Sequence, residues 1–245
     1  MSNYIVIIPT YNEKENVEGI IRKVMSLQPM FDVLIVDDNS PDGTAHIVKG
    51  LQEGFNGRLH LLERTEKNGL GTAYIAGFKW CLDRHYQYIF EMDADFSHNP
   101  DDLPRLLEAC EVQGAGLSVG SRYITGVNVV NWPISRVIMS YYASAYVRFI
   151  TGMTIRDSTA GFVCYKRETL QTINLDKIKF KGYAFQIEMK FKAYLEDIRI
   201  IEVPIIFTDR TRGTSKMSKK IFREAFFGVI ELKINSWFRK KNDRK

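Results

Sequence analysis

The sequence predicts an α/β domain with a mostly parallel central sheet and flanking helices. Three observations predict this fold class. Short apolar runs of strand length alternate with helix-length periodic segments at least four times. Turn residues and acids follow the ends of several strands, and 45% of the 245 residues are apolar, which is enough to bury a large core. Because such sheets bind ligands at the carboxyl ends of their strands, we expect the functional residues to gather at that edge.

The first strand and helix are predicted within the first 25 residues. Residues 4–8 form a β-branched apolar run that stops at Pro9, which is typical of a buried strand. In residues 12–25 the apolar positions recur at helical spacing. We expect Asn12 to cap this helix, with Glu15 three residues later completing a capping box.

The alternation continues through the first half of the chain. Each further strand is predicted from a short β-branched or aromatic run, and each helix from apolar residues at intervals of three and four. The predicted strands are residues 31–36, 58–63, 88–92 and 116–120, and the predicted helices are residues 44–53 and 72–85. Right-handed βαβ units of this kind place successive strands in parallel.

Two carboxylates follow the strand at residues 88–92. Asp93 and Asp95 are separated by one residue, and a Pro-Asp-Asp helix-start signal comes soon after them. Paired carboxylates at the carboxyl end of a buried strand are suited to a divalent cation that carries a phosphorylated ligand. The alternative is a surface turn whose acids cap the next helix. Because parallel strands end at one edge, we expect Glu13 and Asp38 near the same crevice.

Charge and cysteine content bound the function class. The formal net charge is +5, but residues 210–245 alone carry +9 and the rest of the chain −4. A basic segment of this kind faces nucleic acid, an anionic membrane or an anionic substrate, unless it is only a solvated face. The three cysteines lie far apart without CxxC spacing, which is typical of reduced thiols in a cytosolic protein. We expect neither a signal peptide nor a membrane-spanning segment.

Several short motifs together carry a family resemblance. They are IPTYNEKEN at residues 8–16, VDDNSPDG at 36–43, GLGTA at 69–73, MDADFSH at 92–98, GSRY at 120–123 and DRTRGTSK at 209–216. In this order they resemble the inverting family-two glycosyltransferases, and most closely the dolichyl- or polyprenyl-phosphate mannosyltransferases. The resemblance implies a Rossmann-like nucleotide-diphospho-sugar transferase fold of the GT-A type. We expect a catalytic domain at residues 1–218 and a basic amphipathic helix at residues 219–245.

The resemblance also implies roles for individual residues. The nucleoside pocket would be formed by Pro9, Tyr11, Glu13, Val36 and Asp38. Asp93 and Asp95 would hold Mg²⁺ or Mn²⁺ against the diphosphate, with backbone contacts from Ala94. Relatives often carry Gln where Ser97 stands, so the third metal ligand is an open question. The cationic contacts to the sugar nucleotide would be Arg122, Arg210 and Lys216, and the catalytic set would be Asp93, Asp95 and Arg122. We assign Arg136 and Arg212 to the phosphate of the acceptor, although any one cation could be a solvated surface charge.

The resemblance implies transfer of mannose from GDP-mannose to a polyprenyl phosphate with inversion. A lipid phosphate is already ionised at neutral pH, so positioning and charge neutralisation can supply the catalysis without a strong base. One alternative is a UDP-sugar donor such as UDP-glucose. Another is a glycan or protein hydroxyl as acceptor, which would need Asp157 or Glu188 as base. Asp157 could instead orient a sugar hydroxyl or the acceptor, or cap a turn.

A non-catalytic binder of nucleotide sugars or nucleic acid is a further alternative, suggested by the basic segment. The intact Asp93/Asp95 pair argues against it, and we expect no nucleic-acid partner.

Two segments are candidates for contact with a membrane. Residues 137–147 are apolar and Tyr-rich but too short to span a bilayer, and Arg136 and Arg148 flank them. Residues 221–237 repeat aromatic and aliphatic residues at helical intervals among lysines and arginines, a pattern that favours anionic lipid surfaces. The alternative is that this apolar face packs onto the protein's own core. We expect a protein held peripherally at the cytoplasmic face of a membrane, where a membrane-embedded protein could be a partner.

Overall fold

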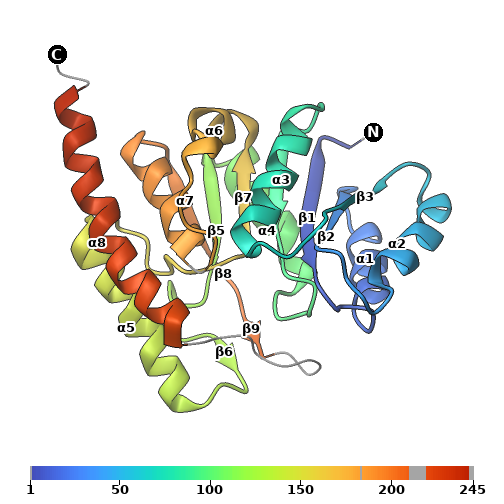
Figure 1. The fold of residues 1–245 in the computed structure, drawn as a ribbon, viewed down its shortest axis with the longest axis horizontal. Coiled ribbons are helices and arrows are strands. Elements are labelled where there is room, and N and C mark those ends of the chain that lie inside the picture. The colour runs from blue at the N-terminus through green and yellow to red at the C-terminus, as the bar shows by residue number, and fades with distance from the viewer. Residues whose placement is uncertain (1, 183, 210–218, 243–245) are drawn as a thin grey trace.

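A seven-stranded sheet forms the centre of the computed structural model, which describes residues 2–182, 184–209 and 219–242 (Figure 1). The strand order is β3-β2-β1-β4-β7-β5-β8. The strands are β1 (Tyr4–Thr10), β2 (Asp32–Asp37), β3 (Leu59–Glu63), β4 (Tyr88–Glu91), β5 (Leu117–Ser121), β7 (Val163–Lys166) and β8 (Ile200–Pro204). Neighbouring strands are parallel except where β7 pairs antiparallel with β4 and β5. The predicted mostly parallel α/β sheet is confirmed.

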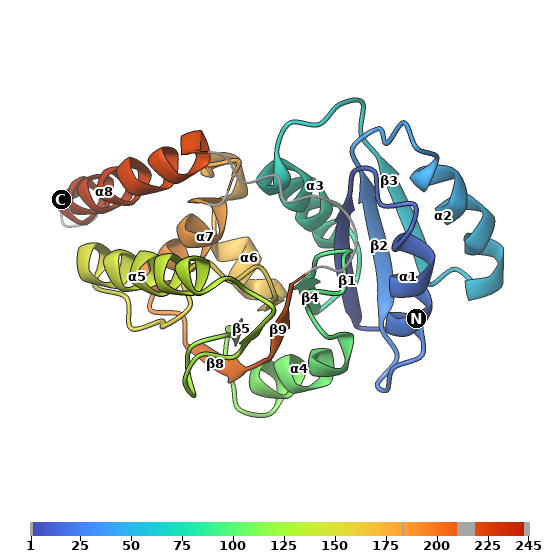
Figure 2. The same ribbon diagram turned by 90° about the horizontal axis from the view of Figure 1, so that it is seen from below.

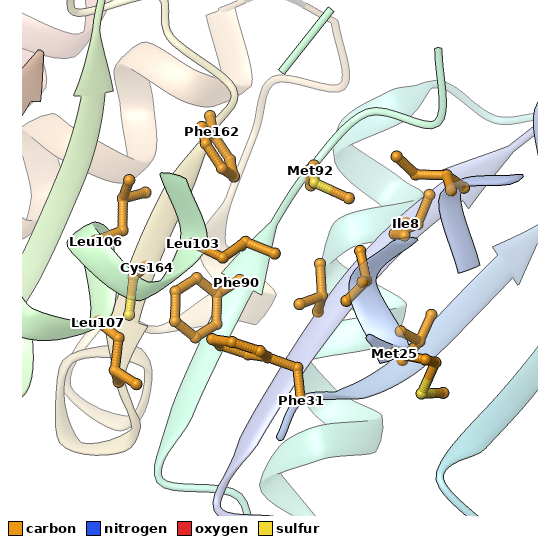
Figure 3. Packing of buried hydrophobic residues seen from close by; sticks show 14 of the residues in the cluster. Ile8, Met25, Phe31, Phe90, Met92, Leu103, Leu106, Leu107, Phe162 and Cys164 are labelled. Carbon is orange, nitrogen blue, oxygen red and sulfur yellow. The ribbon is translucent and has the colours of Figure 1, made fainter. Parts of the chain in front are cut away.

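Helices cover both faces of the sheet. They are α1 (Val17–Met25), α2 (Thr44–Gln52), α3 (Leu70–Leu82), α4 (Leu103–Glu111), α5 (Ile134–Thr151), α6 (Arg167–Thr172), α7 (Ala184–Leu195) and α8 (Lys219–Asn242). Successive residues of β1 point to opposite faces. Val6 and Ile8 join α1 and α4 in one core cluster, which Figure 3 shows, while Ile5 and Ile7 join α3 and α7 in the other. The three cysteines are buried and free, as the sequence predicts.

The first helix starts later than the capping box predicts. α1 begins at Val17, and Asn12 adopts a left-handed backbone conformation with a φ of 58°. The Asn12 N–H donates to Ser40 Oγ (3.0 Å) in the loop after β2, so Asn12 joins two loops. The prediction that Asn12 caps the helix is therefore wrong, because its polar groups are used between loops at the sheet edge.

The carboxylate pair after β4 does not cap the next helix. A 3₁₀ turn, Pro100–Asp102, leads into α4, and the side chain of Asn99 accepts a hydrogen bond from the Asp101 N–H (3.1 Å). The helix start predicted from the Pro-Asp-Asp signal is thus confirmed, with Asn99 as its cap. Other 3₁₀ turns occur at Glu53–Phe55 and Leu175–Lys177.

The second half of the chain adds helices beside the sheet. α8 packs against α5 and α7, and Val229 of α8 is buried against Val147 and Ile187. In both ribbon views α5 and α8 lie side by side at the end of the molecule opposite β3 (Figures 1 and 2). β6 (Val129–Val130) and β9 (Phe207–Thr208) form a separate parallel pair. Across the described ranges, none of the helices has the length and apolar character needed to cross a bilayer.

Candidate active site

A cavity of about 470 Å³ lies beside the carboxyl end of β4. One part of its wall is polar and holds predicted site residues, namely Asp93, Asp95, Ser97, Arg122 and Arg136. Another part is apolar and aromatic and comes mainly from α5 and α8, namely Met139, Tyr142, Tyr146, Val147, Phe226 and Val229. The cavity therefore combines charged groups that suit a phosphorylated ligand with a surface that suits a hydrocarbon.

Asp93 and Asp95 lie in a tight loop directly after β4. The Ser97 N–H donates to Asp95 Oδ1 (3.1 Å), which fixes that carboxylate against the loop. The Asp93 N–H donates to Nδ1 of the buried His98 (3.3 Å), whose ring stacks on Phe162. Burial lowers the pKa of His98 to about 4, so this side chain is a neutral support for the loop at physiological pH. His98 is thus a neighbour of the carboxylate pair.

The two carboxylates fit a cation that arrives together with a phosphorylated ligand. Mg²⁺ is commonly held in proteins by one or two carboxylates, with phosphate oxygens and water completing its shell. Among the described residues there is no cluster of three or more His, Cys, Asp or Glu side chains that could enclose a metal by itself. Ser97 is buried and lines the same cavity, but its role as a third ligand stays a prediction.

The adjacent acids after β2 have different environments. Asp37 accepts hydrogen bonds from Thr10 Oγ1 (2.7 Å), Ser40 Oγ (2.7 Å) and the Ser40 N–H (2.8 Å), so it stabilises the turn. Asp38 lies 2.9 Å from Nη1 of Arg64 and is almost fully buried. Burial raises the pKa of Asp38, and the Arg64 guanidinium opposes that rise only in part. Turn chemistry thus accounts for Asp37, while Asp38 is the acid with a charged partner.

The residues predicted for the nucleoside pocket occupy neighbouring strands and the loops that follow them. Pro9 of β1 is in register with Val36 of β2, so the loops after these strands start at the same edge. Lys67, in the loop after β3, makes a cation–π contact with Tyr11, in the loop after β1. Its Nζ lies 3.9 Å from the centroid of the Tyr11 ring. Glu13 accepts from Asn16 Nδ2 (3.0 Å). These residues border the sheet edge but do not line the 470 Å³ cavity, and neither do Asp38 and Ala94.

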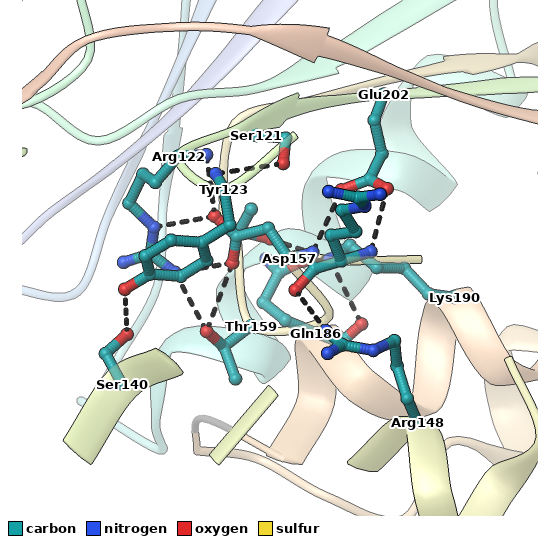
Figure 4. A network of polar contacts seen from close by, with 12 residues as sticks. Ser121, Arg122, Tyr123, Ser140, Arg148, Asp157, Thr159, Gln186, Lys190 and Glu202 are labelled. Atoms are coloured by element: carbon teal, nitrogen blue, oxygen red, sulfur yellow. Dashed lines mark hydrogen bonds and ion pairs between the residues drawn. The ribbon is translucent and has the colours of Figure 1, made fainter. Parts of the chain in front are cut away.

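Arg122 is held by a buried carboxylate. Its Nε donates to Asp157 Oδ2 (2.7 Å), its Nη2 to Asp157 Oδ1 (2.6 Å), and its backbone N–H also to Oδ2 (3.0 Å) (Figure 4). Nη2 also donates to Thr159 Oγ1 (2.9 Å), and the Asp157 N–H donates to Glu202 Oε1 (2.9 Å). Burial alone would raise the pKa of Asp157, but the Arg122 guanidinium outweighs it and holds this pKa below its ordinary value. Asp157 therefore orients an arginine, a role that differs from each of those considered from the sequence.

The other candidate base is also engaged inside the protein. Glu188 on α7 is buried, and its Oε2 accepts from the backbone N–H groups of Lys179 (2.9 Å) and Phe180 (3.0 Å). It does not line the cavity. Neither carboxylate proposed for a hydroxyl acceptor is therefore presented to a substrate in this conformation.

Arg136 lies over the ring of Trp132 at 4.0 Å and pairs with both carboxylate oxygens of Asp209 (3.0 Å). It lines the cavity, and its contact with the acceptor phosphate stays a prediction. The predicted contacts Arg210, Arg212 and Lys216 lie outside the described residues.

Sequence reasoning missed three polar residues of this region: Arg64, Lys67 and Gln186. The two cations belong to the loop after β3, where no periodic pattern marks a position. Gln186 lies on the cavity wall and is paired at helical spacing with the buried Lys190. Their spacing of four positions, which places both polar side chains on one face of the helix, was the available signal.

Several aromatic and aliphatic side chains of α5 and α8 are exposed, and three of them, Met139, Tyr142 and Phe226, line the cavity. The most exposed of them are Ile134, Tyr142, Phe149, Phe227 and Trp237. Val229, on the same helix as Trp237, is only 1% exposed. Packing onto the core and exposure to solvent are therefore both true of α8, at different positions along the helix. The side chains of residues 219–225 and 238–242, which include Phe222 and several basic residues, lie outside the description.

The chain matches known glycosyltransferases across most of its length. Residues 5–173 match the family described as Glycosyl transferase family 2. The polyprenol monophosphomannose synthase of Mycolicibacterium smegmatis is 48% identical over 227 residues, covering 93% of this chain and 85% of the relative. The undecaprenyl-phosphate mannosyltransferase of Micrococcus luteus is 47% identical over 225 residues, covering 92% and 91%.

Solved structures support the fold. The glucosyl-3-phosphoglycerate synthase of Mycobacterium tuberculosis, crystallised with Mn²⁺, uridine diphosphate and glucosyl-3-phosphoglycerate, superposes with a TM-score of 0.65 over 95% of this chain and 79% of that one. The same enzyme with Mn²⁺ and UDP-glucose also gives a TM-score of 0.65. Sequence identity is 16% and 15%, so these similarities concern the fold alone.

Proposed function

Because the chain belongs to glycosyl transferase family 2, we propose that it transfers mannose from GDP-mannose to a polyprenyl phosphate with inversion at the anomeric carbon. The observation that carries this proposal is the two-part cavity, in which paired aspartates and arginines adjoin an apolar, aromatic wall. A polyprenyl phosphate has the matching halves, an anionic head and a hydrocarbon chain. The names of the two relatives that are nearly half identical support mannosyl transfer to a polyprenyl phosphate.

The donor would lie along the carboxyl edge of β1, β2 and β4. Its nucleoside would contact Pro9, Tyr11, Glu13, Val36 and Asp38, and its diphosphate would lie near Asp93, Ala94 and Asp95. A divalent cation, Mg²⁺ or Mn²⁺, bound by Asp93 and Asp95 would neutralise charge on the departing nucleoside diphosphate. Ser97 is a candidate further ligand. Arg122, Arg210 and Lys216 would add positive charge around the same phosphates.

The acceptor phosphate would supply the nucleophile. Its oxygen attacks the anomeric carbon as the bond from that carbon to the diphosphate oxygen breaks, and the electron pair leaves with GDP. No proton must be removed, which agrees with the engagement of Asp157 and Glu188 in internal hydrogen bonds. Arg136 and Arg212 would hold the acceptor's phosphate in line, so that an α-linked donor gives a β-linked product.

Peripheral docking on the cytoplasmic face of a membrane would deliver the lipid to this cavity. Three exposed side chains of α5 and α8, Met139, Tyr142 and Phe226, form part of its apolar wall, so a hydrocarbon chain from a bilayer could enter the cavity along them. A membrane-embedded partner protein would be an additional anchor. In this proposal residues 1–218 carry the catalysis and residues 219–245 contribute mainly to docking.

Purified protein incubated with Mg²⁺, undecaprenyl phosphate and GDP-mannose tests the proposal. The expected product is a β-mannosyl lipid phosphate, identified by mass spectrometry and by the anomeric coupling constant of the sugar. Turnover of UDP-glucose in place of GDP-mannose would replace the donor but retain the reaction class. Transfer to a glycan or protein hydroxyl, with none to the lipid, would reject the proposed acceptor.

A further inference from the structure

Gln186 of α7 is a cavity-lining side chain held between two buried charged groups. It is only 3% exposed. Its Nε2 donates to Glu91 Oε2 (2.6 Å), and its Oε1 accepts from Lys190 Nζ (3.1 Å). Glu91 lies at the end of β4, two residues before Asp93, and both charged partners are fully buried.

These partners fix the direction of the amide. An ammonium group only donates hydrogen bonds, so the Gln186 oxygen faces Lys190 and its nitrogen therefore faces Glu91. The Lys190 ammonium also donates to the carbonyl oxygens of Ala160 (2.7 Å) and Gln186 (3.2 Å), which uses its three donors. The amide of Gln186 therefore has a fixed orientation where it lines the cavity. Figure 4 includes Gln186 and Lys190 in the polar network around Asp157.

A primary amide in this arrangement still has hydrogen-bonding capacity. It carries a second N–H and a second oxygen lone pair beyond those used by Glu91 and Lys190. Gly161 lies next to it, where even an added Cβ would stand 3.7 Å from Nε2, so no side chain from that position covers the amide. A fixed donor and acceptor side by side are complementary to the hydroxyl groups of a sugar.

The cavity wall that contains Gln186 also contains the carboxylate pair. A sugar attached to a diphosphate at Asp93 and Asp95 would therefore occupy the cavity that Gln186 lines. We propose that Gln186 is a specificity-determining residue that recognises a hydroxyl group of the donor sugar. This inference rests on the proposed function and adds to it the residue that reads the sugar rather than the nucleotide.

An amide suits this position better than a carboxylate. A glutamate at residue 186 would place a second negative charge against Glu91, and like charges in a buried site oppose each other's ionisation. The amide instead bridges the anion and the cation while remaining neutral itself. It can thus contact a neutral sugar hydroxyl without attracting a competing cation.

The test measures transfer by wild type and Gln186→Met with GDP-mannose and with its 2-, 3-, 4- and 6-deoxy analogues. Methionine keeps the length of the side chain but loses the amide. With GDP-mannose we expect kcat/KM of the variant to fall roughly 10- to 100-fold, because the sugar hydroxyl loses the amide group that pairs with it. For the one analogue that lacks the recognised hydroxyl, wild type and variant should differ by less than about threefold.

Binding of GDP alone, followed by calorimetry, should be the same in both proteins within about twofold. Equal losses with all five donors would overturn the inference, because a merely structural role weakens every donor alike. Unchanged kinetics would also overturn it. If wild type transfers no mannose at all, the proposed function fails first and the inference with it.

Two further variants separate loss of the amide from a general effect of the substitution on folding. Gln52→Met removes another glutamine hydrogen bond, from Nε2 to the Leu59 carbonyl (3.2 Å), far from the cavity, and should keep full activity and discrimination. If Gln186→Met does not fold, Gln186→Asn keeps the polar group but shortens its reach. The same deoxy series then decides the question.

Discussion

The Arg122 guanidinium donates two hydrogen bonds, of 2.6 and 2.7 Å, to the carboxylate of Asp157, which is fully buried. A buried ion pair of this kind adds little net stability relative to apolar residues, but removal of one partner leaves the other as an uncompensated buried charge. The pair is therefore better understood as a device that fixes the position of Arg122. A fixed arginine beside a phosphate site loses less conformational entropy when the ligand binds.

Substitution of Asp157 should reduce both stability and activity. In Asp157→Ala the guanidinium is left buried without its carboxylate, so we expect the free energy of unfolding to fall by about 3–5 kcal/mol. Urea denaturation measures this change. Asp176→Asn provides a control, because it removes an exposed ion pair with Lys79 and should change stability very little.

Kinetics of the folded Asp157→Asn protein separate orientation from stability. Asparagine keeps the shape of the side chain but can satisfy only part of the arginine fork, so kcat/KM for mannosyl transfer should fall by roughly tenfold or more. A variant with wild-type kinetics and reduced stability would mean that the pair is structural only.

The same pair predicts how stability depends on pH. The pKa of Asp157 lies below its ordinary value of 3.8, so the folded state favours the ionised form. The stabilisation is fully present above about pH 4 and is lost as the pH falls from there through the folded-state pKa. The difference in unfolding free energy between wild type and Asp157→Asn should therefore narrow as the pH is lowered from 5 towards 2. A constant difference over that range would contradict this assignment.

Local patterns in the sequence predict the sheet edge well but not the partners across it. The β-branched runs and the acids that end them correctly predict β1, β2 and β4 and bring Asp93 and Asp95 to one cavity. The Arg122–Asp157 pair depends on β7, which enters the sheet antiparallel between β4 and β5. That strand order joins residues 35 positions apart through long-range packing, and no periodicity encodes it.

The same limit explains the details of the loops. The capping box at Asn12 is a local signal. It does not form, because the Asn12 N–H donates a hydrogen bond to Ser40, 28 residues away. Likewise, adjacent acids after β2 look alike in sequence, yet Asp37 bonds the turn while Asp38 meets Arg64. Loop partners are decided by tertiary contacts, so they emerge only from the structure.

Removal of Asp95 should abolish transfer while the fold survives. The loss of a carboxylate proposed to bind the metal should remove several kcal/mol of charge stabilisation in the transition state, so Asp95→Ala should lower kcat at least about 1,000-fold. Circular dichroism should be unchanged. Asp101→Asn is the matched control, since this acid pairs with Lys23 at the surface and should keep full activity. EDTA should abolish the transfer activity of the wild-type protein, and excess Mg²⁺ or Mn²⁺ should restore that activity. Activity that survives chelation would refute a role for the cation.

Two positions on α8 should respond differently to substitution. Trp237 is 63% exposed, whereas Val229 packs in the core against α5 and α7. In Trp237→Ser, partitioning onto liposomes that contain anionic lipid should weaken roughly tenfold, because less apolar surface enters the bilayer interface. In Val229→Ala the free energy of unfolding should fall by about 2 kcal/mol, while partitioning of the folded protein stays the same. Point substitutions are preferable to deletion of residues 219–245, since deletion would also remove Val229 from the core. Liposome sedimentation at several salt concentrations measures the partitioning of each variant. Partitioning of Trp237→Ser equal to that of wild type would show that Trp237 does not contact the membrane.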